Sequence, residues 1–123
     1  MTDAIQPKGL PVPASPYSPV FRAGEMVYTS GQTGAGGDGA VAEGVEAQTR
    51  QTLENVRVCL EAAGCGLADV VKVTAYLADM ADFETYNAVY REFFTQPYPA
   101  RTTVGAALAP GLMVEIEAVA KLP

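Results

Sequence analysis

The chain has 123 residues, of which 49% are hydrophobic and 18% charged, which predicts one globular domain spanning residues 1–123 with its own core. Fourteen acidic and eight basic side chains give a formal net charge of −6, and this charge disfavours binding to nucleic-acid phosphates. The sequence contains no histidine, which excludes Ser-His-Asp and Cys-His nucleophilic sites and the common histidine-based zinc sites.

The N-terminal segment, residues 1–19, holds five of the nine prolines and predicts an extended, polyproline-like arm held at Pro16-Tyr17. It lacks the basic and apolar stretches of a signal peptide, and no apolar run in the chain is long enough to cross a bilayer. We therefore expect no membrane contact and a cytoplasmic location.

Alternating apolar residues after this arm predict a hairpin of Val20–Arg22 and Met26–Ser30, with Gly24 in the turn. The next segment, Gly31–Gly39, contains five glycines, which is typical of a mobile loop. Whether this loop closes over a site is left open by the sequence.

A helix is predicted from about Val45 to Ala63, because its small and apolar residues recur at helical spacing, and Gly64 follows as a cap. The buried stripe would consist of Thr49, Thr52, Leu53, Val56, Cys59, Leu60 and Ala63. Cys59 lies within this stripe and Cys65 follows the cap. Their spacing suits neither a metal site nor a disulfide framework, so both are expected to be free thiols, as in a reducing cytoplasm.

The second half of the chain alternates strand and helix patterns. Asp69–Ala78 is rich in β-branched residues and apolar on both faces, which predicts a central strand covered on both sides. A second helix is expected from about Ala81 to Phe94, begun by Asp79 or Asp82. Its apolar stripe would be formed by Phe83, Tyr86, Val89, Tyr90 and Phe93.

Two further strands, Arg101–Ala107 and Met113–Ala120, are predicted to follow and to be joined through a turn at Pro110-Gly111. The order of elements indicates an α+β fold, a mixed sheet with two helices packed on one face. The last strand alternates strictly, so its even-numbered positions would face the core and Glu115 and Glu117 the opposite side.

The face of Arg101 stays open at this stage. A tight turn at Pro110-Gly111 would place Arg101 on the face of Ile116, away from Glu115. A longer or bulged loop would bring Arg101 to the face of Glu115, and so would a meeting of the two side chains across a subunit boundary.

Several segments from about Ser15 onward carry a family resemblance. They are PYS at 16–18, VYTSGQTG at 27–34, QTLENVRVCLEAAGC at 51–65, VVKVTAYLADMADF at 70–83, YNAVYREFF at 86–94, PARTTV at 99–104 and VEIEAVA at 114–120. Together they resemble the RidA/YjgF family, and the most specific pair is PAR followed by EIEA.

The resemblance implies a chorismate-mutase-like fold, a homotrimer, and sites in the clefts between subunits. It also implies hydrolysis of reactive 2-imino and enamine acids, such as 2-aminoacrylate and 2-iminobutanoate, to 2-keto acids and ammonia. No cofactor and no metal would be needed. The expected partner molecules are therefore small 2-imino or 2-keto acids and further copies of the chain.

Site residues follow from the matching motifs. Arg101 of PAR would bind the substrate carboxylate, and Glu115 of VEIEA would position and deprotonate water. The resemblance adds four substrate-binding candidates, Tyr17, Ser30, Asn87 and Thr103. A guanidinium fork suits a carboxylate, and one carboxylate can serve as the acid and base for adding water to C=N.

The chain departs from the family pattern at Ser15, where glycine is common, at Pro19, where glutamine is common, and at Thr103, where many members have cysteine. Two alternatives stay open, and these changes motivate the first of them. One is a pathway-specific deaminase acting on the aminoacrylate of pyrimidine breakdown or on 2-aminomuconate. The other is a trimer that binds small carboxylates without catalysis.

Overall fold

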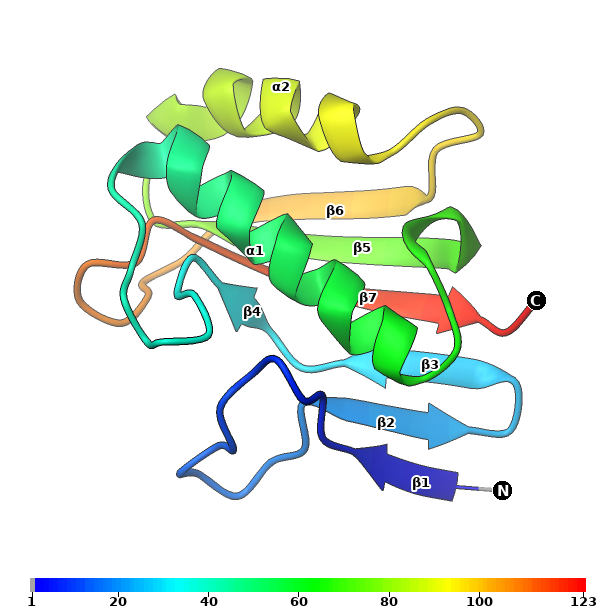
Figure 1. Cartoon of the computed structure of the whole chain (residues 1–123). Helices are drawn as coiled ribbons and strands as arrows, with labels where there is room; N and C mark the ends of the chain where they lie inside the picture. The colour runs from blue at the N-terminus through cyan, green and yellow to red at the C-terminus, as the bar shows by residue number, and fades with distance from the viewer. Residues whose placement is uncertain (1) are drawn as a thin grey trace.

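The computed structural model describes residues 2–123, which form one mixed sheet with two helices on one of its faces (Figure 1). The strands are β1 (Thr2–Ile5), β2 (Val20–Ala23), β3 (Met26–Thr29), β4 (Gln32–Thr33), β5 (Val70–Leu77), β6 (Ala100–Gly105) and β7 (Val114–Lys121). Their spatial order is β1-β2-β3-β7-β5-β6, and the short β4 pairs with β7. The helices are α1 (Gly44–Ala62) and α2 (Phe83–Phe93). The predicted α+β architecture with both helices on one face is confirmed.

The connection between the last two strands differs from the prediction. β6 and β7 do not pair, because β5 lies between them, parallel to β6 and antiparallel to β7. A parallel pair needs a crossover, and α2 provides it between β5 and β6. The segment containing Pro110-Gly111 is therefore a wide loop and not a hairpin turn. The buried Gln48 side chain holds this loop, donating to the Gly111 carbonyl over 3.0 Å and accepting from the Met113 amide over 2.8 Å.

The prediction of an extended N-terminal arm is wrong in part. Residues 2–5 form the edge strand β1, which pairs antiparallel with β2. The arm is held at Ser18 and Pro19, whose carbonyls accept hydrogen bonds from the Ser30 hydroxyl and amide over 2.6 and 2.8 Å. The predicted hairpin of β2 and β3 is confirmed, with Gly24 at a φ of 61° in its turn.

The glycine-rich segment 31–39 is fastened to the body, in contrast to the mobile loop that we predicted. It contains β4, and the Asn55 side chain of α1 donates to the carbonyls of Thr33 and Ala35 over 3.0 and 2.7 Å. Isolated pairing of Ala35 with Val41 closes the turn. In this segment the glycines allow the backbone to pack closely against its neighbours and do not make the loop mobile.

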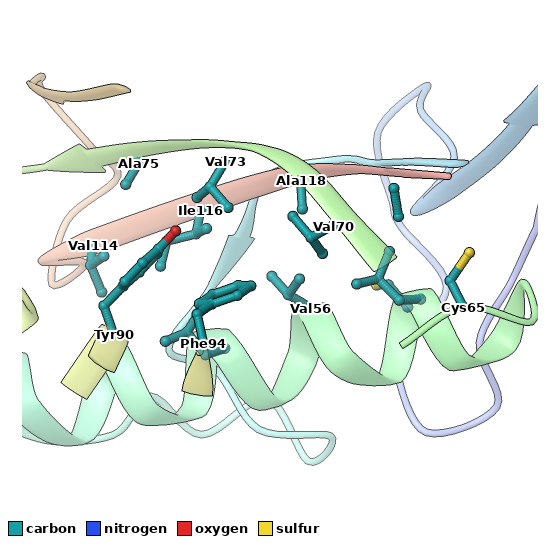
Figure 2. Close-up of a cluster of buried hydrophobic side chains, with 14 of the residues drawn as sticks. Val56, Cys65, Val70, Val73, Ala75, Tyr90, Phe94, Val114, Ile116 and Ala118 are labelled. Atoms are coloured by element: carbon teal, nitrogen blue, oxygen red, sulfur yellow. The ribbon is translucent and has the colours of Figure 1, made fainter. Parts of the chain in front are cut away.

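Both helices present the predicted apolar stripes to the sheet. Every stripe residue expected for α1 is buried, and the helix ends before Gly64, whose φ is 88°. In α2, Tyr86, Val89 and Tyr90 are buried, and Asp79 caps the short 3-10 turn that precedes the helix. Figure 2 shows Tyr90 of α2 and Phe94, the residue after this helix, with Val56 of α1 among the sheet residues. Cys59 and Cys65 are buried free thiols, as expected.

The other face of the sheet has no helix over it (Figure 1). β5 is an internal strand between β7 and the edge strand β6, which agrees with the prediction only in that β5 is not at an edge. The expected cover on both sides is not present within one chain, as the half-buried Lys72, Thr74 and Tyr76 show. Exposed apolar side chains also lie on this open face, namely Phe21, Tyr28 and Val104. None of the helices within residues 2–123 combines the length and the apolar character that a membrane span requires.

Candidate active site

Arg101 points to the helix side of the sheet. It lies opposite Val73 of β5 and Thr103 lies opposite Ala75, and residues opposite one another on neighbouring strands share a face. Val73 and Ala75 are fully buried under the helices. The Arg101 guanidinium therefore meets α2, where Nη1 donates to Asn87 Oδ1 over 2.8 Å.

Three aromatic rings of α2 surround the guanidinium carbon of Arg101. The ring centroids of Phe83, Tyr86 and Tyr90 lie 5.7, 5.5 and 4.6 Å from it, within the range of cation–π attraction. The Tyr86 hydroxyl shares a 2.9 Å hydrogen bond with Thr103 Oγ1. Together with Asn87, these contacts fix the orientation of the fork before any ligand arrives.

Burial controls the ionisation of the two tyrosines beside Arg101. It raises the pKa of Tyr90 to about 12, against the opposing effect of the Arg101 charge. Burial also raises the pKa of Tyr86, while the hydrogen bond with Thr103 and the charge of Arg101 act in the opposite direction. Both rings are therefore neutral near pH 7, and they leave the positive charge of Arg101 uncompensated.

A cavity of about 350 Å³ opens beside this cluster, and we name it the arginine pocket. Its lining is formed by Asn87, Tyr90, Arg91, Tyr98, Pro99 and Arg101. A guanidinium offers five N–H donors, and Asn87 accepts from one of them. The pocket is thus suited to a small planar anion such as a carboxylate.

Glu115 points to the open face of the sheet, opposite Tyr76 of β5 and Thr33 of β4. Its pKa is raised, first by burial and then by the negative charge of Glu117. Glu117 itself accepts a hydrogen bond of 2.8 Å from the Tyr76 hydroxyl. A carboxylate with a raised pKa is a better base for taking a proton from water.

Gly31 leaves the space that the Glu115 carboxylate occupies. A Cβ built on Gly31 would overlap Oε2 and Cδ of Glu115. The hydroxyl of Ser30, the preceding residue, donates a hydrogen bond to the Ser18 carbonyl. Tyr17 is exposed and shares with Gly31 the lining of a second, smaller cavity of about 170 Å³.

Gly31→Ala is expected to displace the Glu115 side chain and to lower any activity that depends on it by at least about tenfold, at a stability cost of about 1–3 kcal/mol. Steady-state kinetics and thermal melts measure the two effects. Gly66→Ala is the matched control, because its Cβ would lie at an ordinary 3.9 Å from Asp69 Oδ2. Equal activity in the two variants would contradict the role given to Gly31.

The six residues predicted from motifs thus form two groups. Arg101, Asn87 and Thr103 gather on the helix side, at the edge strand β6 and α2. Glu115 lies on the open face, and Ser30 and Tyr17 adjoin it through Gly31. Within one chain, Arg101 and Glu115 are on opposite faces of the sheet. The tight-turn alternative was right about the faces, although β5 and not a turn separates the strands.

Three residues at or beside the arginine pocket were missed, since Tyr90 and Arg91 line it and Tyr86 lies against the Arg101 guanidinium. Tyr86 and Tyr90 had been assigned to the apolar stripe of α2, although two hydroxyls in a buried stripe indicate a polar environment nearby. Arg91 was not considered. Its spacing of four from Asn87 was the available signal, since residues four apart lie on one face of a helix.

The fold and this geometry define a small α+β protein with a preorganised arginine pocket for an anion. The chain belongs to the RidA/YjgF family, because the sequence model of that family, described as endoribonuclease L-PSP, matches residues 8–122.

Relatives and solved structures agree with this assignment. A 2-iminobutanoate/2-iminopropanoate deaminase of Salmonella typhimurium is 44% identical over 98% of both chains, and a RutC family protein of Pyrococcus horikoshii is 42% identical over 98% of both. The crystal structure of RidA from a Psychrobacter species has a TM-score of 0.93 at 38% identity, covering 98% of this chain and 99% of its own. Escherichia coli TdcF, crystallised with bound serine, has a TM-score of 0.91 at 36% identity, covering 98% of this chain and 99% of its own.

Proposed function

We propose that this protein is a hydrolytic deaminase that converts reactive 2-imino acids and their enamine tautomers into 2-keto acids and ammonia. The substrates are 2-iminobutanoate and 2-iminopropanoate, the two compounds for which the Salmonella relative is named, together with 2-aminoacrylate, the enamine tautomer of 2-iminopropanoate. The observation that carries the proposal is the arginine fork held by Asn87 and three rings in a pocket without acidic lining.

Arg101 binds the substrate carboxylate in this scheme. The planar fork donates two parallel hydrogen bonds to the two oxygens, which orients the adjacent C=N carbon. The bound serine of the TdcF structure, an amino acid with a carboxylate, is consistent with such a ligand. Tyr86, which shares a hydrogen bond with Thr103, supports the guanidinium with its ring.

Glu115 handles the water. Its carboxylate accepts a proton as the water oxygen bonds to the C=N carbon of the protonated imine, which gives a carbinolamine. The carboxyl group then returns the proton to nitrogen, the C–N bond breaks, and ammonia leaves as the C=O bond forms. The carbinolamine hydroxyl proton passes to the Glu115 carboxylate, which releases it to solvent. Tyr17 lines the cavity on this side together with Gly31, and Ser30 holds the arm that carries Tyr17 through its hydrogen bond to the Ser18 carbonyl.

The two groups must come from different subunits to share one substrate. Arg101 and Glu115 lie on opposite faces of one sheet, and the open face exposes apolar side chains that a neighbour would cover. A homotrimer with cyclic symmetry repeats one such contact three times. Each site then combines the arginine pocket of one subunit with the Glu115 of the next.

Mixing two inactive variants tests this arrangement. Arg101→Ala and Glu115→Gln are each expected to be nearly inactive, whereas trimers reassembled from an equal mixture should regain about a quarter of wild-type activity. The reason is that half of the subunits keep Arg101, half keep Glu115, and a working site needs one of each. Unfolding and refolding the two variants together, followed by an assay of 2-iminobutanoate hydrolysis, gives the measurement.

The control is a mixture of wild type with the double variant, which should also retain about a quarter of its sites, since both functional side chains then come from the same half of the subunits. Absence of any recovery in the first mixture, with recovery in the second, would show that both side chains act from within one chain. Size-exclusion chromatography with light scattering establishes the trimer directly.

A further inference from the structure

The arginine pocket contains a second guanidinium, that of Arg91, to which the hydrolysis of small imino acids gives no role. The chain has a net charge of −6, yet this cavity is lined by two of its eight basic residues and by no acidic one. Within residues 2–123, no carboxylate forms an ion pair with Arg91 or Arg101. The pocket therefore carries two uncompensated positive charges.

The fold places the two guanidiniums along one wall. Asn87 and Arg91 are four residues apart on α2 and are therefore neighbours on its surface. Asn87 in turn accepts a hydrogen bond of 2.8 Å from the Arg101 guanidinium. The carboxylate next in sequence, Glu92, is bound to Arg50 of α1, with an N–O distance of 2.8 Å.

We propose that Arg91 is a specificity residue and that the preferred substrates carry a second negative charge, as the 2-imino dicarboxylates derived from acidic amino acids do. The inference rests on the proposed function and names its substrate class. Arg101 takes the carboxylate next to the C=N carbon, and Arg91 takes the distal one. The volume of about 350 Å³ falls within the range of roughly 300–1,000 Å³ that is usual for small-molecule sites, which leaves room for the longer substituent.

Binding of stable products tests the second charge alone. The matched pair is 2-oxoglutarate and 2-oxopentanoate, which have the same carbon chain and differ in the distal carboxylate. In the wild type we expect 2-oxoglutarate to bind about tenfold more tightly by calorimetry, and in Arg91→Gln we expect the two to bind equally. Affinity for 2-oxopentanoate should stay within about twofold of the wild-type value, because Arg101 is untouched.

Lys121→Gln is the control for a change in net charge, since Lys121 lies at the exposed end of β7 and does not line the pocket. It should keep the tenfold preference. A kinetic arm compares the imines that an amino-acid oxidase generates from glutamate and from norvaline. In Arg91→Gln the KM for the glutamate-derived imine should rise about tenfold, while kcat stays near its wild-type value.

Two results would overturn the inference while leaving the deaminase intact. These are equal affinity for both keto acids in the wild type, or a dicarboxylate preference that persists in Arg91→Gln. Failure of the proposed function gives a different result, since no imine would then be hydrolysed faster than in buffer. That result would also overturn the inference. Circular dichroism of both variants verifies that they fold.

Discussion

Arg101→Lys should lower kcat/KM for 2-iminobutanoate by about a hundredfold, and Arg101→Ala by about a thousandfold. A lysine keeps the charge but loses the planar fork, and its ammonium cannot fill the space among the three rings of α2. Removing one partner of a desolvated charge pair costs about 2–5 kcal/mol, which corresponds to roughly one and a half to nearly four orders of magnitude in rate. Steady-state kinetics with the imine generated in situ provide the numbers.

Arg57→Lys is the matched control for this substitution. Arg57 also lies over an aromatic ring, that of Phe93 at 5.3 Å, and pairs with Glu54, but it is remote from the arginine pocket. Its conversion to lysine should leave kcat/KM within about twofold. If Arg101→Lys behaved like this control, Arg101 would not be the group that binds the substrate carboxylate.

Glu115→Gln should lower kcat by about a hundred- to ten-thousandfold with little change in KM, since it removes the group that exchanges protons with water. Glutamine keeps the size of the side chain and still fits beside Gly31. Glu117→Gln is the control on the same strand and face, because the Glu117 carboxylate already accepts a hydrogen bond from the Tyr76 hydroxyl. It should retain kcat at neutral pH within a few fold.

The control also predicts a shift in the pH profile. Glu115 must be ionised to accept a proton, so kcat/KM falls as the pH is lowered through its pKa. Glu117 raises that pKa through its negative charge, after the larger effect of burial. Glu117→Gln removes the repulsion and lowers the pKa of Glu115, so the acid limb of the profile should move to lower pH. If the acid limb stays in place or moves to higher pH, the limb reports the ionisation of a group other than Glu115.

Local patterns in the sequence were sufficient for the elements and for the faces of the last strand. The alternation in β7 correctly placed Val114, Ile116, Ala118 and Ala120 in the core and Glu115 outside it. The helical stripe of α1 was correct because burial on one side imposes a period of 3.6 residues. Both patterns depend only on neighbours along the chain.

Pairing of distant strands was beyond such patterns. The Pro110-Gly111 pair resembles a hairpin turn, yet β5 lies between the two strands, because the crossover through α2 leaves β6 parallel to it. For the same reason the sequence did not reveal that Arg101 and Glu115 face opposite ways. Motifs supplied the candidate site residues, while the contact of Tyr86 with Arg101 and the place of Tyr90 and Arg91 in the pocket lining required coordinates.

The open face of the sheet has a consequence for how much activity a given amount of protein can deliver. If each site is shared between subunits as proposed, an isolated chain would fold around its own core but contain no complete site, because Arg101 and Glu115 lie on opposite faces of its sheet. Turnover per chain would then follow mass action, being full when the ring is populated and vanishing on dilution below its dissociation constant. Substitutions at the exposed Phe21 or Tyr28 are therefore expected to lower the activity by weakening the trimer, while the fold of each chain persists.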